Sequence, residues 1–375
     1  MDSLSKATNN VVVEAGLDEQ EEQHFSYAMQ LVTSVSLPMV LLAVIRLDVL
    51  EVIAEAGPGA QLSPWDIAAQ VCPKNPDAAA MLDRMLRLLA SFSVLTCSVA
   101  EADASISSQR RVYGLTPVAK YFVQNKTYGA GGGVSLGPLL ALVQDKVFID
   151  SWYQLEDAVR EGGVPFDRVH GMHAFEYPAR DPRFNEVFNK AMVNRTTIAI
   201  NRMVERYKGF EHLKTLVDVG GGLGVTLSVI TAKYPSLKGI NFDLPHVIQH
   251  APVYPGVEHV GGDMFDSVPQ GDAIFLRLIL HDWDDGRCLK LLMNCFKALP
   301  KDGKVIVVDA IVPVVPGTSA CIKAICQSDL IMMAQNPGGK ERSEAEFLDL
   351  ATAAGFRGIR VEFFVCNAWV MEFYK

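Results

Sequence analysis

Positions 216–224 carry the sequence LVDVGGGLG, in which an apolar run ending at Val219 breaks into four glycines over five positions. An apolar run, a cluster of glycines and a helix-like continuation predict a strand, a tight turn and the start of a helix. Glycine tolerates positive φ and lets a ligand approach the backbone, so we expect this turn to be the floor of a ligand site. The next predicted strand ends at Asp243, about twenty residues on, where such folds bind ribose hydroxyls. Together the two segments predict a nucleoside cofactor.

The spacing of the glycines argues against a dinucleotide. The dinucleotide fingerprint is G-x-G-x-x-G, and its last glycine would fall on Val225 when counted from Gly220; counting from Gly222 also fails. The pattern present is D-x-G-x-G-x-G, starting at Asp218, and it resembles the S-adenosylmethionine site of Rossmann-like methyltransferases. That cofactor lacks a pyrophosphate, and its amino acid moiety and sulfonium cation favour nearby carboxylates. For the motif alone, a simple glycine-rich turn is the alternative interpretation.

Composition narrows the class of protein. A chain of 375 residues exceeds the usual size of one core, so about two domains are expected. The net charge of −9 argues against a nucleic-acid partner, which would require basic clusters. No apolar run reaches the ~18 residues of a membrane span, and the chain starts with a polar segment, so we expect no membrane contact and a cytoplasmic location. The seven cysteines form no CxxC pair, so no metal site and no disulfide are expected.

The N-terminal part is predicted to be mainly helical. Residues 1–20 are polar and acidic without a hydrophobic period, and we expect a flexible N-terminus there. The helical and strongly apolar pattern of residues 24–56 favours a partner, because it leaves apolar surface exposed. Ser63 is placed to cap a helix that begins with Pro64.

The following elements resemble a winged-helix module. A long helix is expected over residues 77–92, and two strand-like pieces, 94–98 and 111–115, then bracket a polar loop. A DNA-binding role is disfavoured, because the chain is acidic and the long helix has no basic stripe. We therefore expect residues 21–165 to form a winged-helix-like dimerisation domain. The side chains expected on the exposed face of the long helix are Asp77, Asp83, Arg84 and Arg87.

From Leu213 onward the sequence alternates between strand-like and helix-like segments. Five βα units followed by a hairpin of two strands predict a mostly parallel sheet with an antiparallel edge, as in methyltransferases rather than dehydrogenases. We therefore expect an α/β fold with a seven-stranded Rossmann-like sheet, in an S-adenosylmethionine-binding catalytic domain over residues 166–375. The predicted strands are 215–219, 239–242, 257–260, 273–277, 305–310, 359–365 and 368–373.

Polar residues stand at the predicted carboxyl ends of successive strands, where open parallel sheets bind their ligands. Asp263 and Met264, after the third strand, would suit an adenine through an acceptor for its amino group and an apolar platform for its ring. Taken alone, Asp263 is equally well explained as a turn residue after two glycines. Arg277 ends the fourth strand, and His281 follows it.

His281 is the candidate general base. Methyl transfer to an oxygen needs a base because a neutral hydroxyl is a poor nucleophile, and histidine accepts a proton most readily near neutral pH. Asp309, at the end of the fifth strand, and Glu341, after a glycine-rich turn, are candidates for orienting its imidazole, as in a serine hydrolase triad. A phenol, with a pKa of about 10 like tyrosine, is far easier to deprotonate than an alcohol. For His281 by itself, a packing role is the alternative interpretation.

Longer stretches of the chain match a family pattern at residues 181–185, 216–224, 239–247, 256–265, 281–283 and 336–342. They resemble the plant caffeic acid O-methyltransferase family, and the similarity extends from about Phe25 to the C-terminus. The resemblance implies a homodimer, S-adenosylmethionine as methyl donor, and metal-independent transfer to a phenolic small molecule. It also implies His281 as base, flanked by Asp309 and Glu341.

The same resemblance assigns binding residues. It implies a cofactor site formed by Asp218, Gly220, Asp243, Asp263, Met264 and Arg277. It implies an acceptor pocket formed by Leu142, Val143, Phe184, Phe188, Met192, Asp282, Met332 and Asn336. Phe184, Phe188 and Met192 lie on the helix expected to start near residue 182, and for these three a role in the core is the alternative interpretation.

Some positions depart from the family pattern. Arg277 and Asp309 stand where lysine and glutamate are usual, so the charges persist but the geometry differs. The pair 142–143, Pro178 and Leu278 replace a Met-Asn pair, a histidine and a tryptophan, which makes the pocket more apolar and roomier. We therefore expect O-methylation of a phenolic plant metabolite larger than a simple cinnamate, such as a lignan, alkaloid or flavonoid. An N-methyltransferase of an alkaloid amine and a non-catalytic winged-helix regulator are the alternatives left open.

Overall fold

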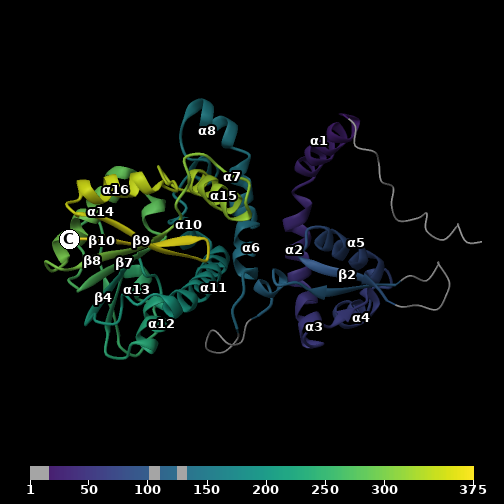
Figure 1. Ribbon diagram of the computed structural model, residues 1–375, viewed down its shortest axis with the longest axis horizontal. Helices are drawn as coiled ribbons and strands as arrows, with labels where there is room; N and C mark the ends of the chain where they lie inside the picture. The colour runs from purple at the N-terminus through teal and green to yellow at the C-terminus, as the bar shows by residue number, and fades with distance from the viewer. Residues whose placement is uncertain (1–16, 101–109, 125–132) are drawn as a thin grey trace, which may run out of the picture. The chain divides into compact units, whose positions relative to one another are not determined.

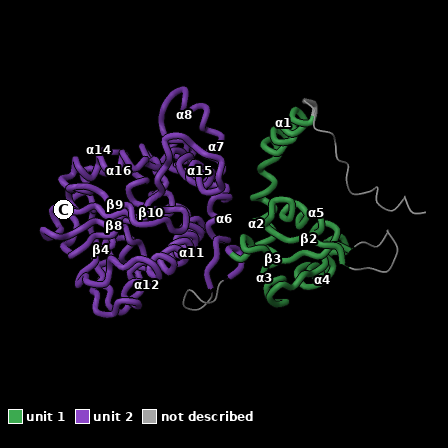
Figure 2. Tube along the Cα trace, viewed as in Figure 1, with its two compact units in different colours: residues 1–120 green, residues 121–375 purple. Residues whose placement is uncertain are grey.

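The computed structural model describes residues 17–100, 110–124 and 133–375, so most of the polar loop expected before residue 111 lies outside the described residues. By its internal contacts the chain divides into two compact units, with the division between Lys120 and Tyr121 (Figure 2). Within the described ranges no single helix is long and apolar enough to cross a membrane. One bent pair, Glu19–Val32 with Ser36–Arg46, passes that test by length and composition only.

The first unit is mainly helical and contains a small antiparallel sheet in the order β1-β3-β2. Its core includes Val44, Leu50, Ile53 and Leu86, whose exposed fractions are 1% or less. The predicted helices and the two predicted strands are present, and the short strand β1 was not predicted. The elements are α1 (Leu17–Val32), α2 (Ser36–Arg46), α3 (Val49–Glu55), β1 (Gln61–Leu62), α4 (Pro64–Val71), α5 (Ala78–Ser91), β2 (Leu95–Val99) and β3 (Arg111–Leu115).

Local hydrogen bonds explain where α4 begins. The Ser63 side chain accepts a hydrogen bond from the backbone nitrogen of Asp66 at 3.2 Å, and the Asp66 carboxylate accepts one from the backbone nitrogen of Ser63 at 3.2 Å. This reciprocal capping box precedes a proline at the first helical position, where the missing N–H costs nothing. The predicted cap is confirmed.

Two expectations about the first unit are corrected. Asp83 of α5 is not exposed, because its carboxylate accepts hydrogen bonds from the Arg111 guanidinium at 2.9 and 2.5 Å and from the Tyr113 hydroxyl at 2.8 Å, which ties β3 to α5. The helix α1 begins at Leu17, inside the segment expected to be flexible. Acidic side chains such as Glu19 in the first turn stabilise a helix through its dipole, so a charged segment need not be irregular. Residues 1–16 lie outside the described residues.

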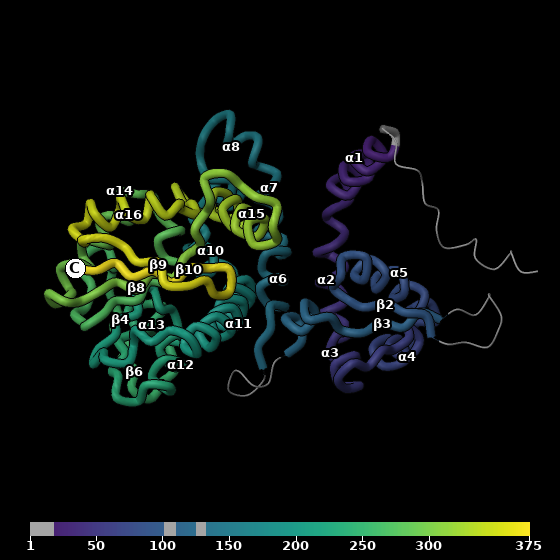
Figure 3. Tube along the Cα trace, viewed as in Figure 1, coloured from purple at the N-terminus to yellow at the C-terminus, as the bar shows by residue number. Residues whose placement is uncertain are grey.

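The second unit is built on a seven-stranded sheet in the order β6-β5-β4-β7-β8-β10-β9. The first five of these strands pair in parallel, and β10 pairs antiparallel with both β8 and β9, as predicted. Figure 3 shows the C-terminal hairpin beside β8, although about fifty residues separate them in the chain. The strands are β4 (Thr215–Val219), β5 (Lys238–Asp243), β6 (Val257–Gly261), β7 (Ala273–Arg277), β8 (Lys304–Asp309), β9 (Gly358–Val365) and β10 (Ala368–Tyr374).

Helices cover both faces of this sheet (Figure 1). Ile200 and Leu227, from α11 and α12, pack on one face, and Leu291 and Phe347, from α14 and α16, pack on the other. The helices α6 to α9 also belong to this unit, because α6 packs on α11 while α7 and α9 pack on α15. The expected domain boundary at residue 165 stays a prediction. The helices are α6 (Gly137–Val143), α7 (Lys146–Trp152), α8 (Leu155–Glu161), α9 (Pro165–His170), α10 (Tyr177–Arg180), α11 (Pro182–Arg206), α12 (Val225–Lys233), α13 (Pro245–Ile248), α14 (Asp285–Ala298), α15 (Ala320–Gln335) and α16 (Glu344–Ala353).

Candidate active site

The glycine loop after β4 is held against the end of β5. The Gly220 nitrogen donates to the Phe242 carbonyl and the Gly222 nitrogen donates to the Asp243 carboxylate, both at 2.8 Å. Gly220 and Gly222 have φ values of 70° and 58°, and a Cβ at Gly220 would collide with Ile279. A Cβ at Gly222 would meet nothing within 4 Å, so this side of the loop is open. The loop therefore needs glycines, and it touches the segment that leads to His281.

Two carboxylates lie beneath this loop. Asp218 is 2% exposed, and none of the described residues donates a hydrogen bond to its Oδ2 atom. Burial and the neighbouring Asp243 raise the pKa of Asp218 to about 7. Burial also raises the pKa of Asp243, against the hydrogen bonds that it accepts from Gly222 and Leu244. A buried carboxylate oxygen without a donor is suited to a ligand that brings a cation or an N–H group.

The other expected cofactor residues differ in whether their side chains already have partners within the protein. Asp263 is exposed, and its Oδ1 accepts a hydrogen bond from the Phe265 nitrogen at 2.8 Å, which is the turn role considered as its alternative. Met264 is partly buried against the core under the sheet. Arg277 donates to the Thr196 hydroxyl at 3.0 Å. Burial and the charge of the nearby Arg195 lower the pKa of Arg277 to about 10.

A short 3₁₀ turn, η3 (Leu280–Asp282), carries His281 at the end of β7. Arg342, whose side chain is fully buried, donates to the carbonyl oxygens of Leu280 at 2.6 Å and Trp283 at 2.8 Å. The same guanidinium forms an ion pair with Asp285 at 2.7 Å. Arg342 thus holds the backbone on both sides of the histidine.

His281 is 4% exposed and contacts two carboxylates. Its Nδ1 lies 3.0 Å from Glu341 Oε1, and its Nε2 lies 3.6 Å from Asp282 Oδ1. Burial by itself would lower the pKa of His281, but Asp282, Glu341 and Asp309 outweigh burial and raise the pKa to about 9. Since Glu341 occupies Nδ1, the Nε2 atom is the one left to face a substrate.

Asp309 lies near His281 but makes no hydrogen bond to it. It is fully buried, and neither of its carboxylate oxygens has a hydrogen-bond partner among the described residues. Burial raises its pKa to about 7, although the positive charge of His281 opposes this rise. The expected pair of orienting carboxylates is therefore a single one in contact, Glu341, with Asp309 as a more distant charge.

The expected acceptor residues fall into two groups. Leu142 and Phe184 are 2% and 0% exposed within a buried cluster where Phe184 makes an edge contact with Phe148, which favours the core interpretation left open for Phe184 and places Leu142 in the same core. Val143, Phe188 and Met192 are only partly buried.

The polar members of the group meet at η3. Asn336, at the end of α15, donates to Asp282 Oδ1 at 2.8 Å, and its amide lies 3.5 Å from the Met332 sulfur. Burial raises the pKa of Asp282 to about 6, against the charge of His281. Asn336 and Met332, two of the residues expected from the resemblance, are thus connected to His281 through Asp282.

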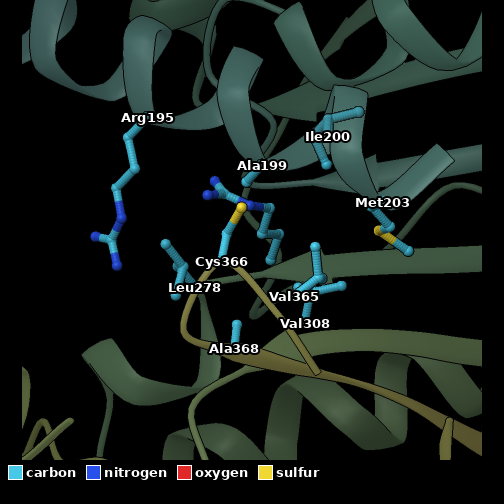
Figure 4. Close-up of a pocket in the computed structure, with 10 residues that line it drawn as sticks. Arg195, Ala199, Ile200, Met203, Leu278, Val308, Val365, Cys366 and Ala368 are labelled. Atoms are coloured by element: carbon cyan, nitrogen blue, oxygen red, sulfur yellow. The ribbon is translucent and has the colours of Figure 1, made fainter. Parts of the chain in front are cut away.

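Several residues that shape the site were not predicted. Ser328 and Asp329 of α15 hold Glu341: the Ser328 hydroxyl donates to Oε1 at 2.8 Å, and the Glu341 nitrogen donates to Asp329 at 2.8 Å. Arg195 of α11 lines a small cavity with Arg277, Leu278 and apolar residues of α11, β8, β9 and β10 (Figure 4). The sequence did contain a signal for Arg195: it stands three residues after Met192, so on a helix it lies on the same face as that expected acceptor residue.

Comparisons with known proteins agree with this arrangement. An O-methyltransferase domain matches residues 152–357, and an O-methyltransferase dimerisation domain matches residues 29–125. The chain is an O-methyltransferase. It is 61% identical to catechol O-methyltransferase 1 of Solanum lycopersicum over 368 residues, covering 95% of this chain and 96% of that one. It is 56% identical to caffeic acid 3-O-methyltransferase of Prunus dulcis over 356 residues, covering 95% of each.

Solved structures share the fold of this O-methyltransferase. A methyltransferase of calicheamicin biosynthesis in a form with bound S-adenosylhomocysteine has a TM-score of 0.75 at 24% identity, covering 96% of this chain and 99% of that one. Human N-acetylserotonin methyltransferase in complex with S-adenosylmethionine has a TM-score of 0.74 at 21% identity, covering 97% and 99%. The predicted family, fold class, O-methyltransferase activity and methyl donor, S-adenosylmethionine, are confirmed.

Proposed function

We propose that this O-methyltransferase methylates a phenolic hydroxyl, with His281 as the general base. The observation that carries the proposal is the 3.0 Å contact of Glu341 with Nδ1, which leaves Nε2 to accept a proton at the end of β7. Close relatives are named for catechol and caffeic acid, both of which are phenols. An N-methyltransferase acting on a neutral amine would need no base, so the buried histidine favours the oxygen acceptor.

The cofactor residues fit S-adenosylmethionine. We assign its binding to Asp218, Gly220, Asp243, Asp263, Met264 and Arg277, because an open glycine loop and unpaired carboxylate oxygens suit a ligand with an amino group and a sulfonium. When bound, this cofactor supplies a methyl group activated by the positive sulfur. The contact between Gly220 and Ile279 brings the loop close to the turn that holds His281.

The protein's part in the reaction is to take and hold a proton. The acceptor hydroxyl gives its proton to His281 Nε2, and the imidazolium is stabilised by Glu341, as in a catalytic triad. A base whose pKa lies near 9 is well matched to a phenol with a pKa of about 10. Orienting the acceptor against a fixed base accounts for further acceleration.

We further propose an acceptor with a sizeable apolar body, such as a lignan, alkaloid or flavonoid. Val143, Phe188 and Met192 would contact that body, while Asp282, Met332 and Asn336 surround the reacting end. A homodimer is also proposed, because a dimerisation domain is present and apolar side chains such as Phe25 and Val32 are exposed on α1. The cytoplasmic location stays a prediction.

Replacing His281 tests the base. We expect His281→Ala to lower kcat by about 10²–10⁴-fold while the dissociation constant of S-adenosylmethionine is unchanged, because the imidazole acts on the acceptor. Single-turnover assays with catechol and titration calorimetry with the cofactor measure the two quantities. His212→Ala, at an exposed position before β4, is the matched control. Retention of wild-type turnover by His281→Ala would refute the assignment.

A further inference from the structure

Arg195 of α11 has an unusual setting for an arginine side chain. It lies three residues after Met192 on α11, so it extends the same helix face as Phe188 and Met192 beyond their apolar surface. In Figure 4 its side chain is extended, and its guanidinium lies apart from the other labelled side chains. It is partly buried, and within the described residues it makes no hydrogen bond and no ion pair. Burial lowers its pKa, against the pull of three nearby carboxylates.

Those carboxylates are the ones that surround the catalytic histidine. Asp282, Glu341 and Asp309 all interact electrostatically with Arg195, and its charge in turn lowers the pKa values of Asp282 and Glu341. Asp282 lies beside Nε2 of His281, the ring nitrogen that faces the acceptor. Arg195 is therefore close to the carboxylates on both sides of the imidazole, and the cavity that it lines also includes Leu278, three residues before His281.

A purely structural role explains this setting poorly. Asn336 donates to one oxygen of Asp282 and Ser328 to one oxygen of Glu341. Glu341 Oε2 and both Asp309 oxygens have no hydrogen-bond partner among the described residues, yet Arg195 donates to none of them. A guanidinium that compensated these charges would be expected to bond them directly, in the bidentate geometry that arginine favours. A partly buried arginine without a partner keeps its N–H donors available for a ligand. An anionic oxygen is the ligand atom that best offsets the cost of its desolvation, because it forms strong charge-assisted hydrogen bonds with a guanidinium.

We propose that Arg195 is a catalytic residue that binds the reacting oxygen of the acceptor and stabilises the phenolate. This inference rests on the proposed phenol O-methylation. In the step concerned, the O–H bond of the acceptor breaks, the proton moves to Nε2 of His281, and the electron pair stays on the oxygen. The negative charge that forms then lies between the imidazolium and the guanidinium, as in an oxyanion hole.

If Arg195 stabilises the phenolate, the effect of losing it should depend on the acidity of the acceptor. A weakly acidic phenol such as catechol depends on the enzyme to form its phenolate, whereas 4-nitrocatechol is far more acidic and reaches the enzyme largely ionised at pH 8.5. Loss of Arg195 should therefore harm transfer to catechol much more than transfer to 4-nitrocatechol. A residue that only supports the fold would reduce both rates alike.

The experiment compares Arg195→Met and Arg195→Lys with the wild type on both acceptors. We expect Arg195→Met to lower kcat for catechol by about 10²-fold, as for removal of one oxyanion donor, with a loss of less than about tenfold for 4-nitrocatechol. Arg195→Lys keeps the charge and should recover part of the catechol rate. Arg206→Met is the matched control, because Arg206 is an exposed arginine on the same helix that donates to the Phe364 carbonyl.

Equal losses on the two acceptors, or no loss on catechol, would overturn the role of Arg195. If Arg195→Met fails to fold, as judged by its melting curve, the same acceptor comparison with Arg195→Lys decides the question. Failure of the proposed function gives a different result: the wild type itself would methylate neither phenol, while still binding S-adenosylmethionine.

Discussion

At the scale of single residues, the site is governed by how carboxylates surround His281. Glu341 contacts Nδ1 and Asp282 lies near Nε2, and together with Asp309 they hold the pKa of the histidine at about 9. A base is active only when neutral, so at pH 7 most of the enzyme without cofactor carries a protonated His281. For the proposed base, both its strength and the pH at which it acts follow from this arrangement.

The first prediction concerns this pH dependence. The ratio kcat/KM should rise about tenfold per pH unit at acid pH, because deprotonation of His281 creates the active form, and should level off towards pH 9. Glu341→Gln removes a charge that raises the His281 pKa, so the break should move to lower pH while the plateau falls. The measurement is kcat/KM for the acceptor from pH 6 to 10 at saturating cofactor. A flat profile, or a break that Glu341→Gln leaves in place, would contradict it.

At the scale of elements, the segment after β7 shows what local pattern predicts and what it misses. The bounds of β4 and β7 match the expected strands, because buried parallel strands are short apolar runs ended by glycine or polar residues. The turn η3 was not predicted, since its shape depends on Arg342, which stands about sixty residues later and donates to its carbonyl oxygens. A helix or strand is determined largely by residues that are neighbours in the sequence, whereas the conformation of this turn depends on a side chain distant in the sequence.

Removing Arg342 should therefore disrupt the turn. We expect Arg342→Met to destabilise the fold by about 2–6 kcal/mol, because it leaves the carbonyl oxygens of Leu280 and Trp283 without their donor, while Asp285 is mostly exposed and adds little. It should also lower kcat through displacement of His281. Denaturant unfolding and turnover measure the two effects. The control is Arg287→Met on α14, which is half exposed and should change stability by less than about 1 kcal/mol. Equal effects of the two variants would contradict the role given to Arg342.

At the scale of the whole molecule, the first unit carries more apolar surface than one copy can bury. Phe25, Leu31 and Val32 of α1 are 62%, 57% and 75% exposed, and the match to a dimerisation domain begins within α1, at residue 29. Exposed apolar side chains in this number mark an interaction surface. A second copy of the chain is the occupant that the family match indicates.

Charges placed on this surface should dissociate the assembly. We expect the double variant Phe25→Glu and Met29→Glu, one helical turn apart on one face of α1, to shift the mass in solution from two copies to one. Light scattering during gel filtration measures the mass. Gln23→Glu introduces a charge on the opposite side of α1 and should leave the mass unchanged. A wild-type protein that already runs as one copy would contradict the expectation.

The sequence by itself determined the chemistry of this protein and the frame that holds it. The spacing of the glycines after Val219, the carboxylate of Asp243 and the histidine after β7 are local features, and the carboxyl ends of parallel strands bring them to one edge of the sheet. Only the tertiary structure decided which side chains touch His281. Glu341 contacts its imidazole while Asp309 makes no hydrogen bond to it, and Arg195 of α11 lies near the carboxylates around it. Contacts between residues distant in the chain depend on how α11 and α15 pack against the sheet.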